Sequence, residues 1–195
     1  MEMKETLIIR SATENDAEDI LRIYSYYVMN TVITFEYTVP SLDDFRERIR
    51  NIISVYPFLV CLVNDRIAGY AYASPHMERA AYHWNAVLSV YLENKYTGQG
   101  IGSILYETLM DILKKQHVQN VYGIVTYPNI PSEKLHLKTG FTPVGIFHHT
   151  GFKYNRWHDV IWYEKFIGDN EKEPEPLVAY PHVEGNLLKV VLENN

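Results

Sequence analysis

The hydrophobic residues of this chain follow two periods, and the alternation between the two predicts the order of its helices and strands. Apolar residues spaced three or four positions apart follow Thr13 and Pro40-Ser41, which is typical of amphipathic helices. Elsewhere they alternate with polar residues or form short runs, which is typical of strands. We expect helices after Thr13, after Ser41, from Ile101 and from Ser132 to Gly140, and strands at 7–10, 58–63, 67–73, 85–93, 118–126, 141–147 and 159–166.

This order predicts an α+β fold in which about four helices flank a mixed, mostly antiparallel central sheet. Asn64-Asp65-Arg66 separates two strands by a length that suits a hairpin. A helix separates the strands at 85–93 and 118–126, so we expect these two to pair in parallel through a crossover connection. Residues 148–158 lie between the last two predicted strands.

The strand at 85–93 leads directly into a glycine-rich segment that opens a helix. Gly98, Gly100 and Gly102 fall within five positions, and the helical period starts at Ile101. The first N–H groups of a helix have no intrahelical partner, and the helix dipole adds partial positive charge there. Glycine lets the backbone approach a phosphate closely and adopt positive φ values. The segment 97–102 therefore predicts a cradle for a pyrophosphate.

Two common nucleotide-binding motifs do not fit this segment. A P-loop requires a Lys-Ser/Thr pair directly after its last glycine, whereas Gly102 is followed by Ser103-Ile104. A dinucleotide-binding motif belongs in the first βα turn of a repeated βαβ unit, whereas these glycines lie in mid-chain after several strands. Both interpretations are rejected.

Length and composition predict a soluble globular protein. The 195 residues suit one domain, and 47% of them are hydrophobic and 22% charged. A net charge of −6 argues against nucleic acid and anionic membrane as partners, and no apolar run approaches a membrane span. The first residues lack the layout of a signal peptide, and Cys61 is the one cysteine, so we expect a cytoplasmic protein without an intrachain disulfide.

The character of the chain changes near its C-terminus. A charged, proline-bearing stretch follows Ile167, and 187–192 is apolar again. We expect one domain at 1–167 and a C-terminal extension at 168–195. The apolar end of this extension has three possible roles: an added strand, a contact with a partner subunit, or a loose tail.

Four further segments stand out beside the glycine segment. They are Thr31-Val32-Ile33-Thr34-Phe35-Glu36, Tyr82-His83-Trp84 leading into Ser89-Val90-Tyr91, Pro128 to Ser132 with Leu135-His136 and Gly140-Phe141, and Gly151-Phe152-Lys153 with Arg156 to Val160. In order and spacing these segments resemble the GNAT superfamily of N-acetyltransferases, and within it the phosphinothricin and methionine sulfoximine acetyltransferases. The resemblance spans roughly Leu7 to Phe166, and the glycine segment matches the superfamily's phosphate loop except at Thr97.

The resemblance implies acetyl-CoA as co-substrate, direct acetyl transfer and no metal. It assigns the pantetheine arm and the thioester oxygen to backbone groups of Val90, Tyr91 and Leu92, and the far end of pantetheine to Asn129 and Ser132. The pyrophosphate is assigned to the loop residues Thr97, Gly98, Gln99, Gly100, Ile101, Gly102 and Ser103.

The resemblance also implies catalytic groups, with one departure from the family. His136 stands where many members carry a tyrosine that protonates the thiolate. The family's glutamate base is replaced by Val87, and a positioned base is typically worth about 10²–10⁴ in rate. Glu36 is the best substitute among the carboxylates, ahead of Asp159 and Glu93. A partly neutral substrate amine, or loss of turnover, are the other two outcomes.

Substrate recognition is assigned by resemblance as well. Arg79 and Lys153 match positions near the anionic groups of the amino acid. The candidate walls of a side-chain pocket are Phe35, Tyr82, Trp84 and Trp157. We expect an N-acetyltransferase that acts on the primary amine of a small amino acid or analogue, as a homodimer. The alternatives are another amine, such as a polyamine or a peptide N-terminus, or a non-catalytic acetyl-CoA-binding module.

Overall fold

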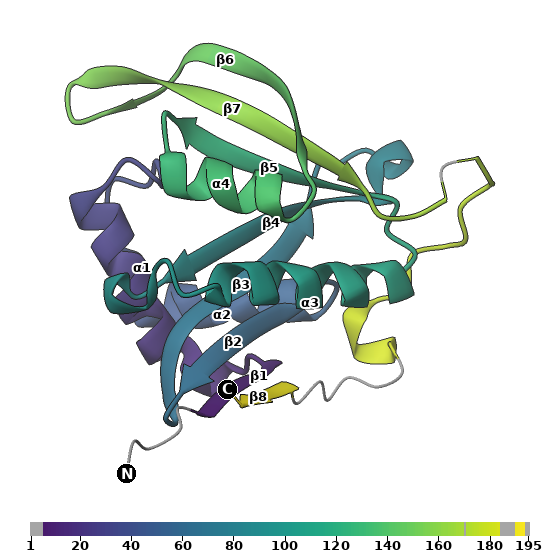
Figure 1. Ribbon diagram of the computed structural model, residues 1–195, viewed down its shortest axis with the longest axis horizontal. Helices are drawn as coiled ribbons and strands as arrows, with labels where there is room; N and C mark the ends of the chain where they lie inside the picture. The colour runs from purple at the N-terminus through teal and green to yellow at the C-terminus, as the bar shows by residue number, and fades with distance from the viewer. Residues whose placement is uncertain (1–5, 170, 184–189, 194–195) are drawn as a thin grey trace.

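One mixed β-sheet forms the centre of the molecule, and helices cover both of its faces (Figure 1). Across residues 6–169, 171–183 and 190–193, which the computed structural model describes, eight strands join in the order β6-β7-β5-β4-β3-β2-β1-β8. Within these residues β4 and β5 pair in parallel and the other neighbouring strands are antiparallel. The predicted α+β fold and its parallel crossover are confirmed.

The elements follow the predicted order closely. The strands are β1 Thr6–Ser11, β2 Phe58–Val63, β3 Arg66–Pro75, β4 Asn85–Leu92, β5 Asn120–Tyr127, β6 Thr142–Lys153, β7 Arg156–Phe166 and β8 Val190–Glu193. The helices are α1 Ala17–Asn30, α2 Leu42–Ile53, α3 Ile101–Lys115 and α4 Ile130–Lys138. The hairpin between β2 and β3 turns at Asn64 and Asp65, whose φ angles are 50° and 62°, so the predicted tight turn is confirmed.

The sheet separates two hydrophobic cores. On one face α1 and α2 pack over β2 and β3, and on the other α3 packs over β3 and β4. Neighbouring residues of β3 show this directly, because Tyr70 belongs to the first core and Ala71 to the second. Side chains alternate across a strand, so both faces of the central strands must be apolar.

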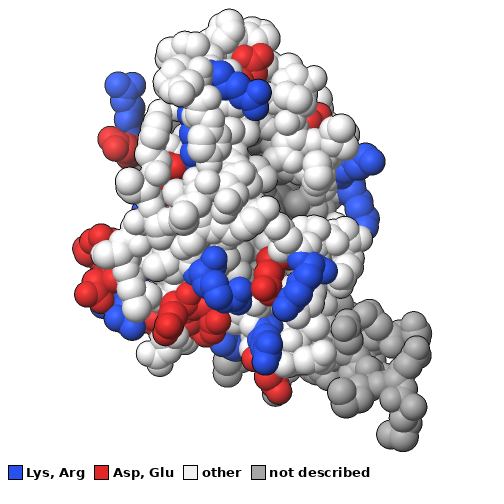
Figure 2. Space-filling model, turned by 90° about the vertical axis from the view of Figure 1, so that its left-hand side faces the viewer, with Lys and Arg blue, Asp and Glu red and all other residues white. Residues whose placement is uncertain are grey.

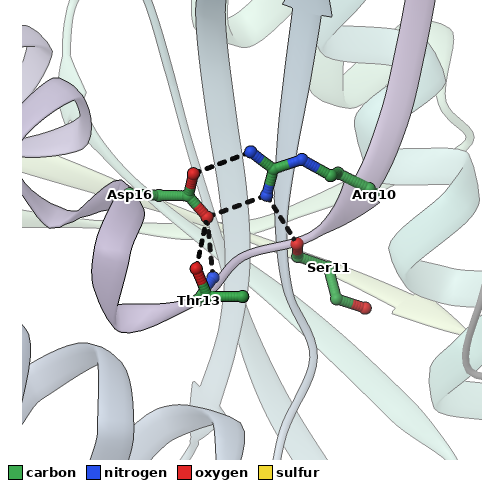
Figure 3. A network of polar contacts seen from close by, with 4 residues as sticks. All are labelled: Arg10, Ser11, Thr13 and Asp16. Atoms are coloured by element: carbon green, nitrogen blue, oxygen red, sulfur yellow. Dashed lines mark hydrogen bonds and ion pairs between the residues drawn. The ribbon is translucent and has the colours of Figure 1, made fainter.

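A charged network fixes the connection from β1 to α1 (Figure 3). Arg10 donates two hydrogen bonds to the Asp16 carboxylate, at 2.7 and 2.8 Å, and the Thr13 N–H donates a third at 2.8 Å. Burial disfavours the charged carboxylate, but these donors outweigh it and lower the pKa of Asp16. The network therefore closes the turn that starts the first helix.

Two predicted boundaries were wrong. The segment 148–158 is not a separate connection, because β6 runs to Lys153 and β7 starts at Arg156. Tyr154 and Asn155 form the turn with φ angles of 51° and 58°. Irregular register between Phe147 and Gly151 breaks the alternation of apolar residues. This bulge hid the long hairpin from a period-2 reading of the sequence.

The C-terminal residues run back along the edge of the domain. Gln116 is fully buried and donates from Nε2 to the carbonyl oxygens of Val55 and Val178, both at 2.7 Å. The Trp84 indole donates to the Glu175 carbonyl at 2.7 Å. Beyond them β8 pairs antiparallel with β1. Among the three roles considered for the tail, residues 190–193 thus have that of a strand, and 187–189 lie outside the described residues.

The surface and the helices bear on the expected environment. Within the part of the chain that is described, every helix is too short or too polar to cross a membrane. Figure 2 shows Lys and Arg side chains interspersed with Asp and Glu, mainly on the lower part of the face in view. Cys61 is buried, and burial raises the pKa of its thiol to about 12, so it is a poor nucleophile.

Candidate active site

The strands β4 and β5 separate after a short parallel ladder. Pairing runs from Asn85 with Asn120 to Leu88 with Gly123, whereas β4 continues to Leu92 and β5 to Tyr127. The side of β4 that faces β5 therefore has no strand partner from Ser89 onward. Backbone N–H and C=O groups left in this way need water, a side chain or a ligand. The gap exposes one edge of a central strand to a binding partner.

The glycine loop lies at the end of this gap and starts α3. Gly98 and Gly100 have φ angles of 77° and 86°, which L-residues with side chains rarely adopt. A Cβ atom at either position would meet nothing within 4 Å, so the need for glycine comes from the backbone conformation rather than from crowding. The helix has Gly100 as its N-cap and no side-chain cap. Its first amides are thus left for an anion.

A cavity of about 510 Å³ joins the parted strand to the glycine loop and the start of α4. It contains most of the predicted cofactor residues: Val90, Leu92, Thr97, Gly98, Gly100, Gly102, Ser103, Asn129 and Ser132. Three predicted residues do not line it. The Tyr91 ring lies on the other face of the sheet against Tyr24 and Tyr27, Ile101 is buried in the core, and the Gln99 amide donates to the Lys95 carbonyl.

The cavity also contains residues that the sequence did not single out. Tyr27 of α1 donates from its hydroxyl to the Leu92 carbonyl at 2.6 Å and so fixes the end of β4. Lys134 and Lys138 of α4 line the cavity as two exposed cations one helical turn apart. Their spacing of four residues places them on one face of the helix, and this was the available signal.

The start of α4 differs from the prediction. A helix was expected from Ser132, but Asn129 caps an earlier start, because its side chain accepts from the Ser132 N–H at 3.3 Å. Glu133 completes the arrangement by accepting from the Asn129 N–H at 2.7 Å. The helix thus begins at Ile130, two residues earlier than Ser132, and a proline at its start hid this from the sequence.

His136 does not reach the cavity. Its side chain is 2% exposed, its Nδ1 bonds to the Ser132 carbonyl at 2.8 Å, and its ring stacks on Tyr163 with centroids 4.9 Å apart. A Cβ atom on Gly123 would lie 2.0 Å from its Nε2, so the imidazole fills the space that this glycine leaves. Burial lowers its pKa. In this geometry His136 is a packed structural residue, and its catalytic role stays a prediction.

Glu36, the predicted base, forms an ion pair with Arg48 of α2 at 2.8 Å. Burial is the main cause of the raised pKa values of Tyr72 and Tyr91, and the nearby Glu36 charge adds to both. Glu36 thus lies near the face of β3 and β4 that α1 and α2 cover. Val87 points to this same face, because its neighbours Ala86 and Leu88 belong to the opposite core.

The other candidate carboxylates are engaged elsewhere. Glu93 forms ion pairs with Arg22 and Lys95 at 3.2 and 3.3 Å. Asp159 accepts from the His149 N–H at 2.9 Å and bonds to His148 at 2.8 Å. The His149 hydrogen bond is the main cause of its lowered pKa. The charged form of Asp159 is thereby stabilised, which disfavours proton uptake by this carboxylate.

The predicted substrate residues are scattered. Arg79 and Tyr82 are exposed on the loop between β3 and β4. Phe35 packs on the backbone of Gly151, where a Cβ atom would lie 2.2 Å from its ring. Lys153 was predicted to bind an anionic group, but it is 2% exposed and donates from Nζ to the carbonyls of Val28 and Thr34 at 2.8 and 2.9 Å. Its ammonium is used to join β6 to the end of α1.

A second cavity, of about 780 Å³, lies on the α2 side of the sheet. Arg48 lines it together with residues at the end of β3 and in the following loop, among them Pro75 and His83. Pro75 pairs with Ala86, the second residue of β4. The second cavity therefore lies at the end of β3 that pairs with the start of β4, while the first one contains Val90 and Leu92 from the end of β4. In the described residues no group of three His, Cys, Asp or Glu side chains could hold a metal ion.

Comparison with known proteins gives a consistent picture. Residues 9–162 match a family model described as an acetyltransferase (GNAT) domain. A phosphinothricin N-acetyltransferase of Streptomyces viridochromogenes is 31% identical over 157 residues, which cover 80% of this chain and 86% of that protein.

Solved structures agree with the sequence relatives. A GNAT superfamily phosphinothricin acetyltransferase from Sinorhizobium meliloti, in complex with AcCoA, has a TM-score of 0.83 at 30% identity and covers 94% of this chain and 97% of its own. A ribosomal-protein-alanine N-acetyltransferase from Brucella melitensis has a TM-score of 0.79 at 29% identity, covering 81% and 98%.

Proposed function

The chain belongs to the GNAT acetyltransferase family and is an N-acetyltransferase, and we propose that its acceptor is the primary amine of a small amino acid or amino-acid analogue. The donor is acetyl-CoA, which supplies the acetyl group as a thioester. Relatives and a solved structure named for phosphinothricin support this class of acceptor.

The observation that carries the proposal is the cavity that joins the parted edge of β4 to the glycine loop. Its glycine-lined end offers helix amides and positive dipole to a diphosphate, and Lys134 and Lys138 line the same cavity. Its other part is an apolar slot lined by Val90, Leu92 and Leu135, which suits a thin pantetheine chain. The residues present therefore fit coenzyme A.

The remaining chemistry falls to side chains on the other face of β4. An acceptor ammonium must lose a proton before its nitrogen can act as a nucleophile. We assign the role of the base that takes this proton to Glu36. Its carboxylate is 35% exposed and lies on the face to which Val87 points. Positioning and charge stabilisation contribute the rest of the rate gain in such a transfer.

A panel of amines tests the proposal. We expect thiol release with phosphinothricin and methionine sulfoximine to exceed release with a polyamine or an alanine-starting peptide. The peptide tests the alternative favoured by the likeness to a ribosomal-protein-alanine acetyltransferase. Release with the peptide or polyamine alone would replace the proposed acceptor. Tight binding of acetyl-CoA without release to any amine would support a non-catalytic binding module instead.

We also propose that two copies associate through the face of β5, β7 and β6 on which Ile124, Trp162 and Phe147 lie. Trp162 contacts Phe147 on this face at a centroid distance of 5.7 Å, and Phe147 and Ile124 are 56% and 44% exposed. Such a patch favours burial against a partner. Sedimentation of the wild type and of Phe147→Asp tests the homodimer, because a single species of one-chain mass in both would contradict it.

The division of the chain and its location complete the proposal. The family match ends at residue 162, which supports an acetyltransferase domain at 1–167 with an extension at 168–195. A buried free thiol at Cys61 agrees with a reducing, cytoplasmic location. Expression of residues 1–167 alone tests the division: a folded product that binds acetyl-CoA supports it, and an unfolded product contradicts it.

A further inference from the structure

The ion pair between Glu36 and Arg48 places one anion beside one cation, so its charges are complementary to those of an amino-acid zwitterion. Arg48 Nη1 donates to Glu36 Oε1 at 2.8 Å, and the two side chains remain 39% and 35% exposed. An α-amino acid presents a carboxylate and an ammonium on one carbon atom. One cation and one anion held side by side are therefore complementary to both of its charged groups.

Arg48 is held in place yet keeps donors for a ligand. Its guanidinium carbon lies 5.5 Å from the centre of the Phe45 ring and 5.9 Å from that of Tyr24. These contacts orient the guanidinium plane. A guanidinium carries five N–H donors, and Glu36 and the Tyr24 hydroxyl are its hydrogen-bond partners in the described residues. Further donors are thus available to a carboxylate.

The position of Arg48 relative to the transfer site is suitable. It lines the 780 Å³ cavity together with Pro75, the residue at the end of β3 that pairs with Ala86 of β4. The cavity for coenzyme A follows the end of the same strand. Donor and acceptor would thus approach β4 from different sides and meet where it separates from β5, just after Leu88.

The cations predicted from the sequence do not fill this role. The Lys153 ammonium is buried and used by two main-chain carbonyls. Arg79 is exposed and does not line either of the two cavities described above. Arg48 is the arginine that lines the 780 Å³ cavity, which we call the acceptor-side cavity.

We propose that Arg48 binds the α-carboxylate of the acceptor and that the Glu36 carboxylate accepts hydrogen bonds from its ammonium group. This ion pair then selects α-amino acids. The inference rests on the proposed function and adds to it the group that the enzyme recognises. The acceptor is then a zwitterion with free α-carboxylate, rather than any primary amine.

Arg48→Gln, assayed with methionine sulfoximine and with its α-carboxamide, tests the inference. We expect kcat/KM for the acid to fall about 10–100-fold, mainly through KM, because a charge-assisted bidentate contact is lost. For the carboxamide, kcat/KM should change less than about twofold, since this substrate lacks the carboxylate. With the acid, kcat/KM of Arg48→Lys should lie between those of the wild type and Arg48→Gln, because an ammonium cannot form the bidentate contact.

A matched control comes from the same helix. Arg46 forms an exposed ion pair with Asp43 at 3.0 Å and does not line the acceptor-side cavity. Arg46→Gln should leave kcat/KM for both substrates unchanged. Equal losses with the acid and the carboxamide in Arg48→Gln would overturn the inference, because they would indicate a structural ion pair only.

Binding separates the inference from the proposed function. Titration of methionine sulfoximine into the wild type and Arg48→Gln, each saturated with coenzyme A, requires no turnover. Weaker binding to the variant supports the inference even if acetyl transfer is absent, which would contradict the proposed function alone. Equal affinity of both proteins for the amino acid would overturn the inference.

Discussion

Leu88 pairs with Gly123 in the last parallel contact between β4 and β5, and beyond this pair the two strands separate. The same glycine leaves room for the His136 ring on the α4 side. One short ladder therefore determines both where the central sheet opens and how α4 is anchored beside the opening.

Gly100→Ala should weaken the binding of acetyl-CoA. The native φ of 86° costs an L-residue about 1–2 kcal/mol, so the loop will shift and its amides will turn away from the diphosphate. Calorimetric titration should show about tenfold weaker binding. Gly145→Ala is the control, since its Cβ atom also meets nothing within 4 Å and its φ is not positive. Unchanged affinity in Gly100→Ala would remove the loop from the site.

Glu36→Gln should slow acetyl transfer to an amino acid by about 10²-fold or more, the usual cost of losing a positioned base. Val87→Glu in the same protein should recover part of the rate, because Val87 stands at the family's base position and faces the same side of the sheet. Thiol release over a range of pH measures both. Full activity of Glu36→Gln would transfer the role to another group.

His136→Phe should retain most acetyl transfer and change how stability depends on pH. Burial holds the folded-state pKa of His136 below the usual 6.5, so the unfolded chain binds the proton more readily. Its contribution is present above about pH 6.5 and is lost as the pH falls toward the folded-state pKa. The free energy of unfolding, measured by denaturant titration at pH 7.5 and at pH 5, should therefore differ less between the two pH values in the variant than in the wild type. A loss of turnover in a stable variant would restore the catalytic role.

Lys153→Met should destabilise the protein by about 2–3 kcal/mol, because two buried carbonyl oxygens lose a charged donor. Urea unfolding measures the change. Arg79→Gln is the comparison, since its side chain is exposed and should alter stability by less than about 0.5 kcal/mol. Wild-type stability of Lys153→Met, combined with a raised KM, would return Lys153 to the substrate site.

Much of the fold was predictable because it depends on local patterns. The helical period after Ser41 gave α2, and Ser41 does cap that helix by accepting from the Asp44 N–H at 3.2 Å. The loop was predictable from its glycines, since the positive φ values of Gly98 and Gly100 are a local backbone requirement. A bulge in β6 and a proline at the start of α4 disturbed these patterns, and there the predicted boundaries were wrong.

The sequence by itself determined the order of the elements and the glycine loop, because periodicity and backbone conformation depend on near neighbours. Only the tertiary structure decided which polar groups are available. His136 and Lys153 are buried by residues distant in the sequence, while Arg48, 12 residues from Glu36, lines a cavity. Burial and pairing arise from contacts between distant segments, and the local sequence pattern does not predict such contacts.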